Sequence, residues 1–169
     1  MTRDKVLTNA RLAGQVTRYH TWPVHRQQSV GEHTWQVLRI YQQIWGSVEP
    51  EVTNYILWHD AGELVTGDPP FPFKRENPQF KESYRLAEGR AVHNMGGYVQ
   101  WLRPELEKRV KICDLLEMYE YGRVERDMGN LYAQPIIEDT FHVVQALLTD
   151  VLEEDHKAIM VYINKIKGE

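Results

Sequence analysis

The sequence predicts an all-α protein that folds as a single helical bundle, and three observations support this class. Apolar side chains recur at helical spacing along most of the 169 residues, and no segment shows the alternation of a convincing strand. The chain also contains no internal repeat, low-complexity tract or convincing linker. Because a chain of this length favours one domain around one core, we expect residues 1–169 to form a single domain.

The first predicted helices lie in the N-terminal third of the chain. A short helix is expected over residues 4–13. Ser29 and Glu32 have the Ser-x-x-Glu spacing of a capping box, a motif that satisfies free N–H groups in the first turn of a helix. They predict a helix that begins there and runs to about Trp45, where Gly46 ends it.

Proline and glycine divide the remainder of the chain. Pro50 suits a first helical turn and Gly67 a helix C-terminus, so a helix is expected near residues 51–65. The proline-rich segment 68–73 cannot lie inside a helix and is predicted to be a rigid loop. Further helices are expected at 78–95, 104–126 and 135–165, with Asp155 as a candidate break in the last.

Composition and charge exclude several classes of protein. The net charge of −4 argues against a general binder of nucleic acid or of acidic membranes. A single cysteine, Cys113, excludes an internal disulfide framework and fits a reducing compartment. No apolar run is long enough to cross a bilayer, and the N-terminus lacks the apolar core of a signal peptide. We therefore expect a cytoplasmic protein that binds neither nucleic acid nor a membrane.

Four polar residues fall where a helical bundle should present apolar side chains. His59 and Asp60 are adjacent in an otherwise apolar helical segment, where an imidazole beside a carboxylate is costly to bury without a partner. His33 extends the apolar face of the preceding predicted helix, and Asp114 lies on the apolar stripe of a later one. A divalent metal ion is the partner that best offsets this cost.

The donor set indicates which metals would suit the site. Two nitrogen and two oxygen donors favour Zn²⁺, Mn²⁺, Fe²⁺ or Co²⁺ and disfavour a thiolate centre. Taken singly, His33 can be a hydrogen-bonded core histidine and Asp114 a buried salt-bridge partner. We interpret the four together as a metal site because they fall on inward faces of different predicted helices.

Two further carboxylates could do chemistry beside that site. Glu63 follows His59 by four residues and Asp60 by three, so a continuous helix would place it on the same face. Asp68 follows Gly67, where the chain can turn back over the site. Two carboxylates beside a metal ion could position a water molecule and transfer its proton. The alternatives are a solvent-facing helix residue for Glu63 and a loop or capping acid for Asp68.

At these residues the sequence resembles the HD-domain metal-dependent phosphohydrolases, whose signature is H…HD…D. The resemblance extends to motifs of the YfbR-like 5′-deoxynucleotidases. Segment 29–37 resembles SVxEHSxQV, 59–68 resembles HDAxExxTGD, 70–74 resembles PTPVK, and 110–114 resembles VKxAD. Arg18 precedes His33 by the interval of that subgroup's substrate-binding arginine, while Tyr19 stands where the deoxynucleotidases have tryptophan.

The short chain and segment 17–23 resemble phage dATP triphosphohydrolases of the DatZ type more closely still. That resemblance implies hydrolysis of dATP to deoxyadenosine and triphosphate, in the host cytoplasm of a phage whose DNA carries 2-aminoadenine. It implies Zn²⁺, Co²⁺ or Mn²⁺ at the HD site, with additional Mg²⁺ or Co²⁺ ions accompanying the triphosphate. It also implies a homo-oligomer, with a hexamer favoured.

The resemblance also assigns roles to individual residues. Glu63 would orient or deprotonate the attacking water, and Asp68 would assist the leaving 5′ oxygen. The substrate contacts would be Arg18, Lys74 and Lys111 to the phosphates, and Tyr19, Trp22 and Pro72 around the base.

Two rival functions stay open at this point. The first is a 5′-deoxynucleotidase that acts on monophosphates through the same metal site. The second belongs to another class, a non-catalytic helical module that binds a metal or a nucleotide. Retention of both Glu63 and Asp68 disfavours the second, because a purely structural metal site needs neither.

Overall fold

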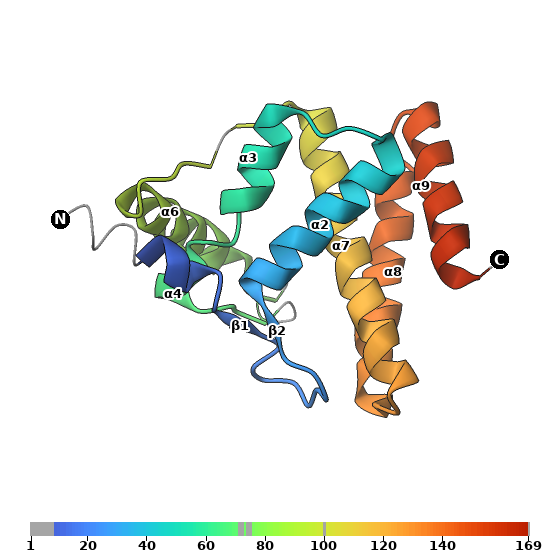
Figure 1. Ribbon diagram of the computed structural model, residues 1–169, viewed down its shortest axis with the longest axis horizontal. Coiled ribbons are helices and arrows are strands. Elements are labelled where there is room, and N and C mark those ends of the chain that lie inside the picture. The colour runs from blue at the N-terminus through green and yellow to red at the C-terminus, as the bar shows by residue number, and fades with distance from the viewer. Residues whose placement is uncertain (1–8, 71–72, 74–75, 100, 169) are drawn as a thin grey trace. The chain divides into compact units, whose positions relative to one another are not determined.

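Residues 9–70, 73, 76–99 and 101–168 are described by the computed structural model, and most of them lie in helices (Figure 1). By their internal contacts they group into two units. Unit 1 comprises Met1–Thr34 and Asn54–Trp101, and unit 2 comprises Trp35–Thr53 and Leu102–Glu169. The expectation of a single domain over residues 1–169 stays a prediction.

Unit 1 contains a small antiparallel ribbon. β1 (Thr17–Arg18) pairs with β2 (Gln28–Ser29), with Thr17 opposite Ser29 and Arg18 opposite Gln28. The sequence pattern did not reveal this ribbon, because two residues are too few to show an alternating pattern. The helical parts of unit 1 are residues 9–13, the first turn of α2 (Val30–Trp45), the end of α3 (Pro50–Trp58), α4 (Glu63–Thr66) and α6 (Pro78–Asn94).

Small side chains let the segments of unit 1 pack closely. One cluster of its buried core consists of Ala13, Ala61, Ala91, Val92 and Met95. A Cβ atom added to Gly62 would lie 2.6 Å from the Cα atom of Glu88 in α6, and one added to Gly97 would lie 2.5 Å from the Trp58 ring. The turn around Gly62, which follows the predicted ligands, is therefore held against α6.

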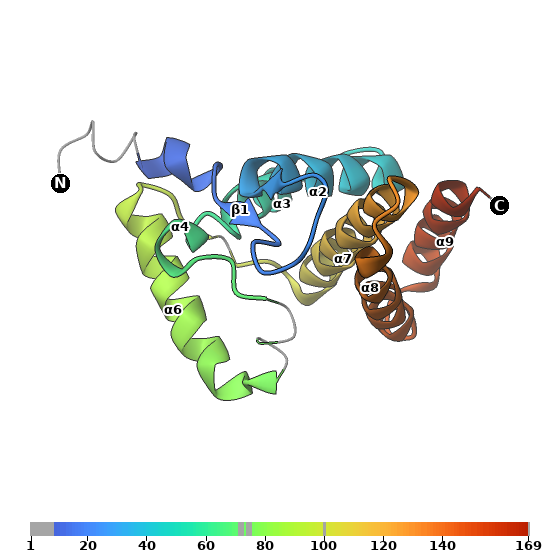
Figure 2. The same cartoon turned by 90° about the horizontal axis from the view of Figure 1, so that it is seen from below.

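Unit 2 is built from longer helices. They are the remainder of α2, the start of α3, α7 (Pro104–Asp127), the 3₁₀ turn η1 (Leu131–Ala133), α8 (Gln134–Leu148) and α9 (Glu153–Lys167). α7 and α8 lie side by side in both views (Figures 1 and 2). No described helix combines the length and apolar character needed to span a membrane.

A buried polar network ties three helices of unit 2 together. The Asp155 carboxylate of α9 accepts a hydrogen bond from Trp45 Nε1 at 2.8 Å and pairs with Arg109 Nη2 at 2.8 Å. Tyr41 donates from its hydroxyl to Glu49 Oε2 at 3.0 Å. Asp155 thus lies inside α9, and the expected break of the last helix falls earlier, at residues 149–152.

Several predicted boundaries are confirmed. α2 begins at Val30 and ends at Trp45, and its cap is the predicted one, since Ser29 Oγ accepts from the Glu32 N–H at 3.1 Å. The helices expected at 78–95 and 104–126 agree with α6 and α7 to within one residue. Of the helix expected over 4–13, only residues 9–13 lie in the described part.

The prediction of one helix over residues 51–65 is wrong. α3 ends at Trp58, and residues 59–62 form turns before α4 begins. These turns use short-range bonds, from Ala61 N to Trp58 O at 3.2 Å and from Glu63 N to Asp60 O at 3.0 Å. The chain therefore leaves the α-helix at the position of the predicted ligands.

Candidate metal centre

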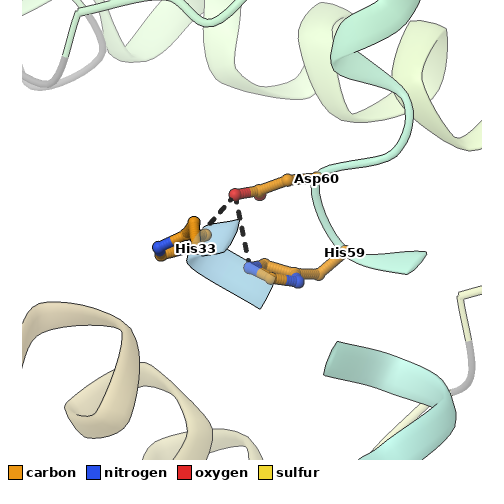
Figure 3. Close-up of side chains that lie close together, drawn as sticks. All are labelled: His33, His59 and Asp60. Atoms are coloured by element: carbon orange, nitrogen blue, oxygen red, sulfur yellow. Dashed lines mark ion pairs between the residues drawn. The ribbon is translucent and has the colours of Figure 1, made fainter. Parts of the chain in front are cut away.

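Three of the four predicted ligands meet in unit 1. His33 Nε2 lies 3.4 Å from Asp60 Oδ2, and His59 Nε2 lies 3.3 Å from the same oxygen (Figure 3). One ligand atom from each residue can be chosen so that all three lie within 4.8 Å of one another, a spacing that can hold a metal ion. His33 is fully buried in the first turn of α2, whereas His59 and Asp60 retain slight exposure.

The end of α3 explains how two neighbouring residues reach the same point. His59 makes the last bond of the helix, from its N–H to Tyr55 O at 2.9 Å, and the chain then turns. Neighbours in a continuous helix point about 100° apart. The turn after Trp58 brings both the His59 ring and the Asp60 carboxylate toward His33 (Figure 3).

The hydrogen bonds of His59 fit a metal ligand. Its Nδ1 atom lies 2.7 Å from the backbone carbonyl oxygen of Ile56, and a carbonyl only accepts, so Nδ1 carries the proton. In the neutral ring, Nε2 then presents a lone pair. That atom is buried, makes no hydrogen bond among the described residues, and faces a carboxylate oxygen. Two lone pairs that face each other repel unless a cation lies between them. The hydrogen bond from His59 Nδ1 to the Ile56 carbonyl is of the kind that usually orients a metal-binding histidine.

Arg18 brings a positive charge to the same oxygen. Its Nη1 donates to Asp60 Oδ2 at 3.0 Å, and only 8% of the arginine side chain is exposed. β1 thus carries the guanidinium to the edge of the ligand cluster. This position suits an arginine that binds an anionic group next to a metal ion.

Tyr19 occupies a strained backbone conformation beside Arg18. Among the described residues other than glycine, Tyr19 is the one with a positive φ, at 56°. The Tyr19 N–H donates to Asp68 Oδ2 at 3.4 Å, and the Tyr19 carbonyl accepts from the Trp22 N–H at 2.9 Å. Strain of this kind is often stored at functional sites. Tyr19 and Trp22 thus close one hydrogen-bonded turn, and the distant Asp68 carboxylate accepts from its first residue.

Glu63 is buried but lies outside the three-residue cluster. It is the first residue of α4 and is 2% exposed. The expectation that it shares a face with His59 assumed a continuous helix, which the turns at 59–62 replace. Glutamate is rarely buried unless it is paired, so the burial of Glu63 in unit 1 is consistent with a role beside a charged group. Glu63 therefore stays a candidate catalytic residue.

Of the remaining predicted site residues, two lie in unit 2 and two lie outside the described residues. Asp114 and Lys111 lie on α7 in unit 2, where Lys111 Nζ pairs with Asp114 Oδ2 at 2.5 Å. Their parts in the metal and phosphate sites stay predictions from the sequence. Pro72 and Lys74 lie outside the described residues.

Tyr55 is a neighbour of the site that the sequence analysis missed. Its ring stacks on the His59 ring, with centroids 6.3 Å apart and an interplanar angle of 15°. Residues four apart on a helix are neighbours, so the spacing of Tyr55 and His59 could have revealed this contact.

Comparison with known proteins identifies the family. A family model described as 5′-deoxynucleotidase YfbR-like matches residues 10–147. The chain belongs to this family. The matched range includes every predicted site residue from Arg18 to Asp114. The resemblance of the motifs to YfbR-like HD phosphohydrolases, which are enzymes, is thereby confirmed.

Two curated YfbR-like relatives show how far the similarity extends. The dATP triphosphohydrolase of Cyanophage S-2L is 30% identical over 132 residues, which cover 73% of this chain and 74% of the relative. The 5′-deoxynucleotidase of Vibrio parahaemolyticus is 30% identical over 86 residues, covering 44% of each chain. This chain thus matches less than half the length of the Vibrio enzyme.

A solved structure confirms the fold. The Cyanophage S-2L HD phosphohydrolase (DatZ), bound to dA and one catalytic Zn²⁺ ion, superposes with a TM-score of 0.76 at 20% identity. The match covers 96% of each chain. The predicted all-α HD-domain class is therefore correct for this YfbR-like chain.

Proposed function

We propose that the protein is a metal-dependent phosphohydrolase that acts on deoxynucleotides. The observation that carries this proposal is the convergence on Asp60 Oδ2 of the His33 and His59 imidazoles, at 3.4 and 3.3 Å, and of Arg18 at 3.0 Å. Two nitrogen ligands and a carboxylate would hold a divalent cation, and the adjacent guanidinium would hold an anion. Family membership supports the same activity.

The ligands proposed for the ion are His33, His59 and Asp60, with Asp114 added from the sequence alone. The donor set suits Zn²⁺, Co²⁺ or Mn²⁺. When bound, such an ion polarises a phosphoryl oxygen and lowers the pKa of a water molecule. Additional Mg²⁺ or Co²⁺ ions would neutralise the charge of a triphosphate substrate.

The protein's own residues would carry the proton transfers. In dATP hydrolysis a water oxygen bonds to the α-phosphorus, and the bond from that phosphorus to the 5′ oxygen breaks. Glu63 would orient the water and accept its proton, and Asp68 would donate a proton to the departing 5′ oxygen. The products are deoxyadenosine and triphosphate.

The remaining predicted residues would bind the substrate. Arg18 would contact the phosphates together with Lys74 and Lys111, offsetting their charge as it redistributes. Tyr19, Trp22 and Pro72 would border the base. By the same family resemblance we propose a homo-oligomer, with a hexamer favoured, that works in the cytoplasm of a phage-infected host and depletes dATP.

Two substrates compete within this proposal. Similarity over 73% of the chain to a dATP triphosphohydrolase favours the triphosphate. The match to a family described as 5′-deoxynucleotidases favours the monophosphate. In both cases the bond from phosphorus to the 5′ oxygen breaks, so the released anion distinguishes them. We favour dATP.

A nucleotide panel tests the proposal. All deoxy- and ribonucleotides at each phosphorylation level are supplied with Zn²⁺, Co²⁺ or Mn²⁺, and the released anion is identified by chromatography. We expect triphosphate from dATP. Release of phosphate from dAMP alone would favour the second substrate, and no hydrolysis with any metal would leave only a binding module.

A matched pair of histidine variants tests the metal centre. We expect His59→Ala to lose bound metal, measured by elemental analysis, together with all hydrolysis. His93→Ala, which changes an exposed histidine of the same unit, should retain both. Equal metal content in the two variants would contradict the assignment of His59.

A further inference from the structure

Unit 2 contains a pocket with an unusual concentration of positive charge. The basic pocket has a volume of about 480 Å³, which is within the range of small-molecule sites. Its lining residues are Tyr119, Arg123, Arg126 and Asp127 from α7, Ile137 from α8 and Lys167 from α9. None of them belongs to the metal centre or to the predicted substrate contacts.

The charges of the basic pocket do not balance. Three of its six lining side chains are cations and one is an anion, although the whole chain carries a net charge of −4. Arg123, Arg126 and Asp127 lie on one face of α7 because they are spaced by three and four residues. Cations brought this close repel one another unless an anion lies between them.

Most donors of these cations are uncommitted among the described residues. Arg123 Nη1 donates to the carbonyl oxygen of Ile166, and Arg126 Nη1 donates to Gln134 Oε1. Lys167 Nζ lies 4.1 Å from the centroid of the Phe141 ring and makes no described hydrogen bond. Each guanidinium has five N–H donors, so several remain for a ligand.

Helix ends account for only part of this arrangement. Arg126 and Lys167 lie in the last turns of α7 and α9, where a cation is favoured by the helix dipole. That effect explains each residue singly. It does not explain why they line one cavity together with Arg123, which lies three residues further inside α7 than Arg126.

We propose that the basic pocket binds a polyphosphate anion, either free or carried by a nucleotide. Arginine forks and a lysine ammonium are the groups that proteins use for phosphate oxygens. The Tyr119 ring contacts the Phe141 ring at 5.4 Å between centroids and has the Arg123 guanidinium at 5.9 Å, so it offers no open platform for a base. Recognition therefore rests on the phosphate chain.

Binding of inorganic triphosphate to the full chain tests this site. Calorimetry is done with a chelator present and in the Arg18→Met/His59→Ala background, which removes the metal ion and one of the phosphate contacts proposed for the substrate site. We expect Arg126→Gln/Lys167→Gln to bind triphosphate about tenfold more weakly or worse, since it loses two charge-assisted contacts. Arg85→Gln/Lys157→Gln, which removes two exposed cations paired with Glu82 and Glu153, is the matched control and should bind normally.

Lysine acetylation of the unaltered protein gives an independent reading that needs no variant to fold. Inorganic triphosphate should protect Lys167 and not Lys157, as measured by mass spectrometry. With a chelator present so that no hydrolysis occurs, dATP should protect Lys167 to a similar extent, because the base is not recognised. Equal triphosphate affinity in the two double variants, or equal labelling of Lys167 with and without triphosphate, would overturn the proposal. Binding that persists when hydrolysis is absent supports this site and tells against the proposed function alone.

Discussion

Arg18 and Asp60 form a largely buried ion pair, with Nη1 of the arginine 3.0 Å from Oδ2 of the carboxylate. The same oxygen lies 3.4 Å from His33 Nε2 and 3.3 Å from His59 Nε2. One carboxylate oxygen is thus shared by the group proposed to bind the substrate and by the groups proposed to bind the metal. Because the proposed substrate contact and the proposed metal ligands are different side chains, mutation of Arg18 can test substrate binding while the metal ligands stay in place.

Arg18→Met should lower activity without removing the metal. The variant keeps an apolar stem but loses the charge-assisted contact to phosphate, which predicts a fall in kcat/KM of about tenfold to a hundredfold. Metal content should be unchanged because the three clustered ligands remain. Arg26→Met, which removes an exposed arginine paired with Glu32, is the control and should leave kcat/KM intact. Loss of metal from Arg18→Met would instead mean that Arg18 holds Asp60 in place.

The positive φ of Tyr19 predicts that glycine at this position gives a more stable protein than alanine. At its φ of 56°, alanine keeps the left-handed strain while glycine does not. Both variants lose the ring, so the comparison isolates the backbone. We expect Tyr19→Gly to exceed Tyr19→Ala in free energy of unfolding by up to about 1 kcal/mol, measured in urea. A more stable alanine variant would show that the backbone is not strained there.

Gly62 should tolerate no side chain. A Cβ atom there would lie 2.6 Å from the Cα atom of Glu88, so Gly62→Ala should destabilise unit 1 by about 1–3 kcal/mol. Gly89→Ala is the matched control, because nothing lies within 4 Å of its Cβ position in α6. That variant should be neutral or slightly more stable, since alanine favours a helix interior. Thermal unfolding of both variants distinguishes packing from a general effect of alanine.

The raised pKa of the Tyr41 hydroxyl predicts that the protein loses stability in alkaline solution. Burial raises the pKa of its hydroxyl above the ordinary value of 10.0, and the contact with Glu49 raises it further. As the pH rises through that ordinary value, the unfolded chain releases the proton and the folded chain retains it. The folded state then binds more protons, so its stability falls as the pH rises further. Tyr41→Phe should show a shallower fall in urea midpoint between neutral pH and about pH 11.

Local patterns predicted the features that depend on local interactions. The start of α2 was correct because Ser29 and Glu32 are three residues apart and make their contact within one turn. The inward position of His33 followed from its spacing along the apolar face of α2. The sequence thereby pointed to the cluster of His33, His59 and Asp60, whose role as metal ligands stays a prediction.

Features that depend on distant partners were not predictable in this way. The chain leaves the helix after Trp58, and the turn that follows packs at Gly62 against Glu88, a residue far along the chain. The contacts of Arg18 with Asp60 and of Tyr19 with Asp68 join positions more than forty residues apart. The family resemblance pointed to Arg18 and Tyr19 although neither lies on a periodic apolar face.

The shortness of β1 limits how this sequence can change. Arg18 and Tyr19 are consecutive, yet they hold the two ends of segment 60–68 through Asp60 and Asp68. Since side chains alternate sides along a strand, a single deletion within β1 would turn the guanidinium away and release both ends at once. Insertions within the connecting loop of residues 20–27 spare this alternation. Evolution therefore has a tolerant stretch in which to change the fit of a ligand, next to an arginine whose place in the strand it can hardly shift.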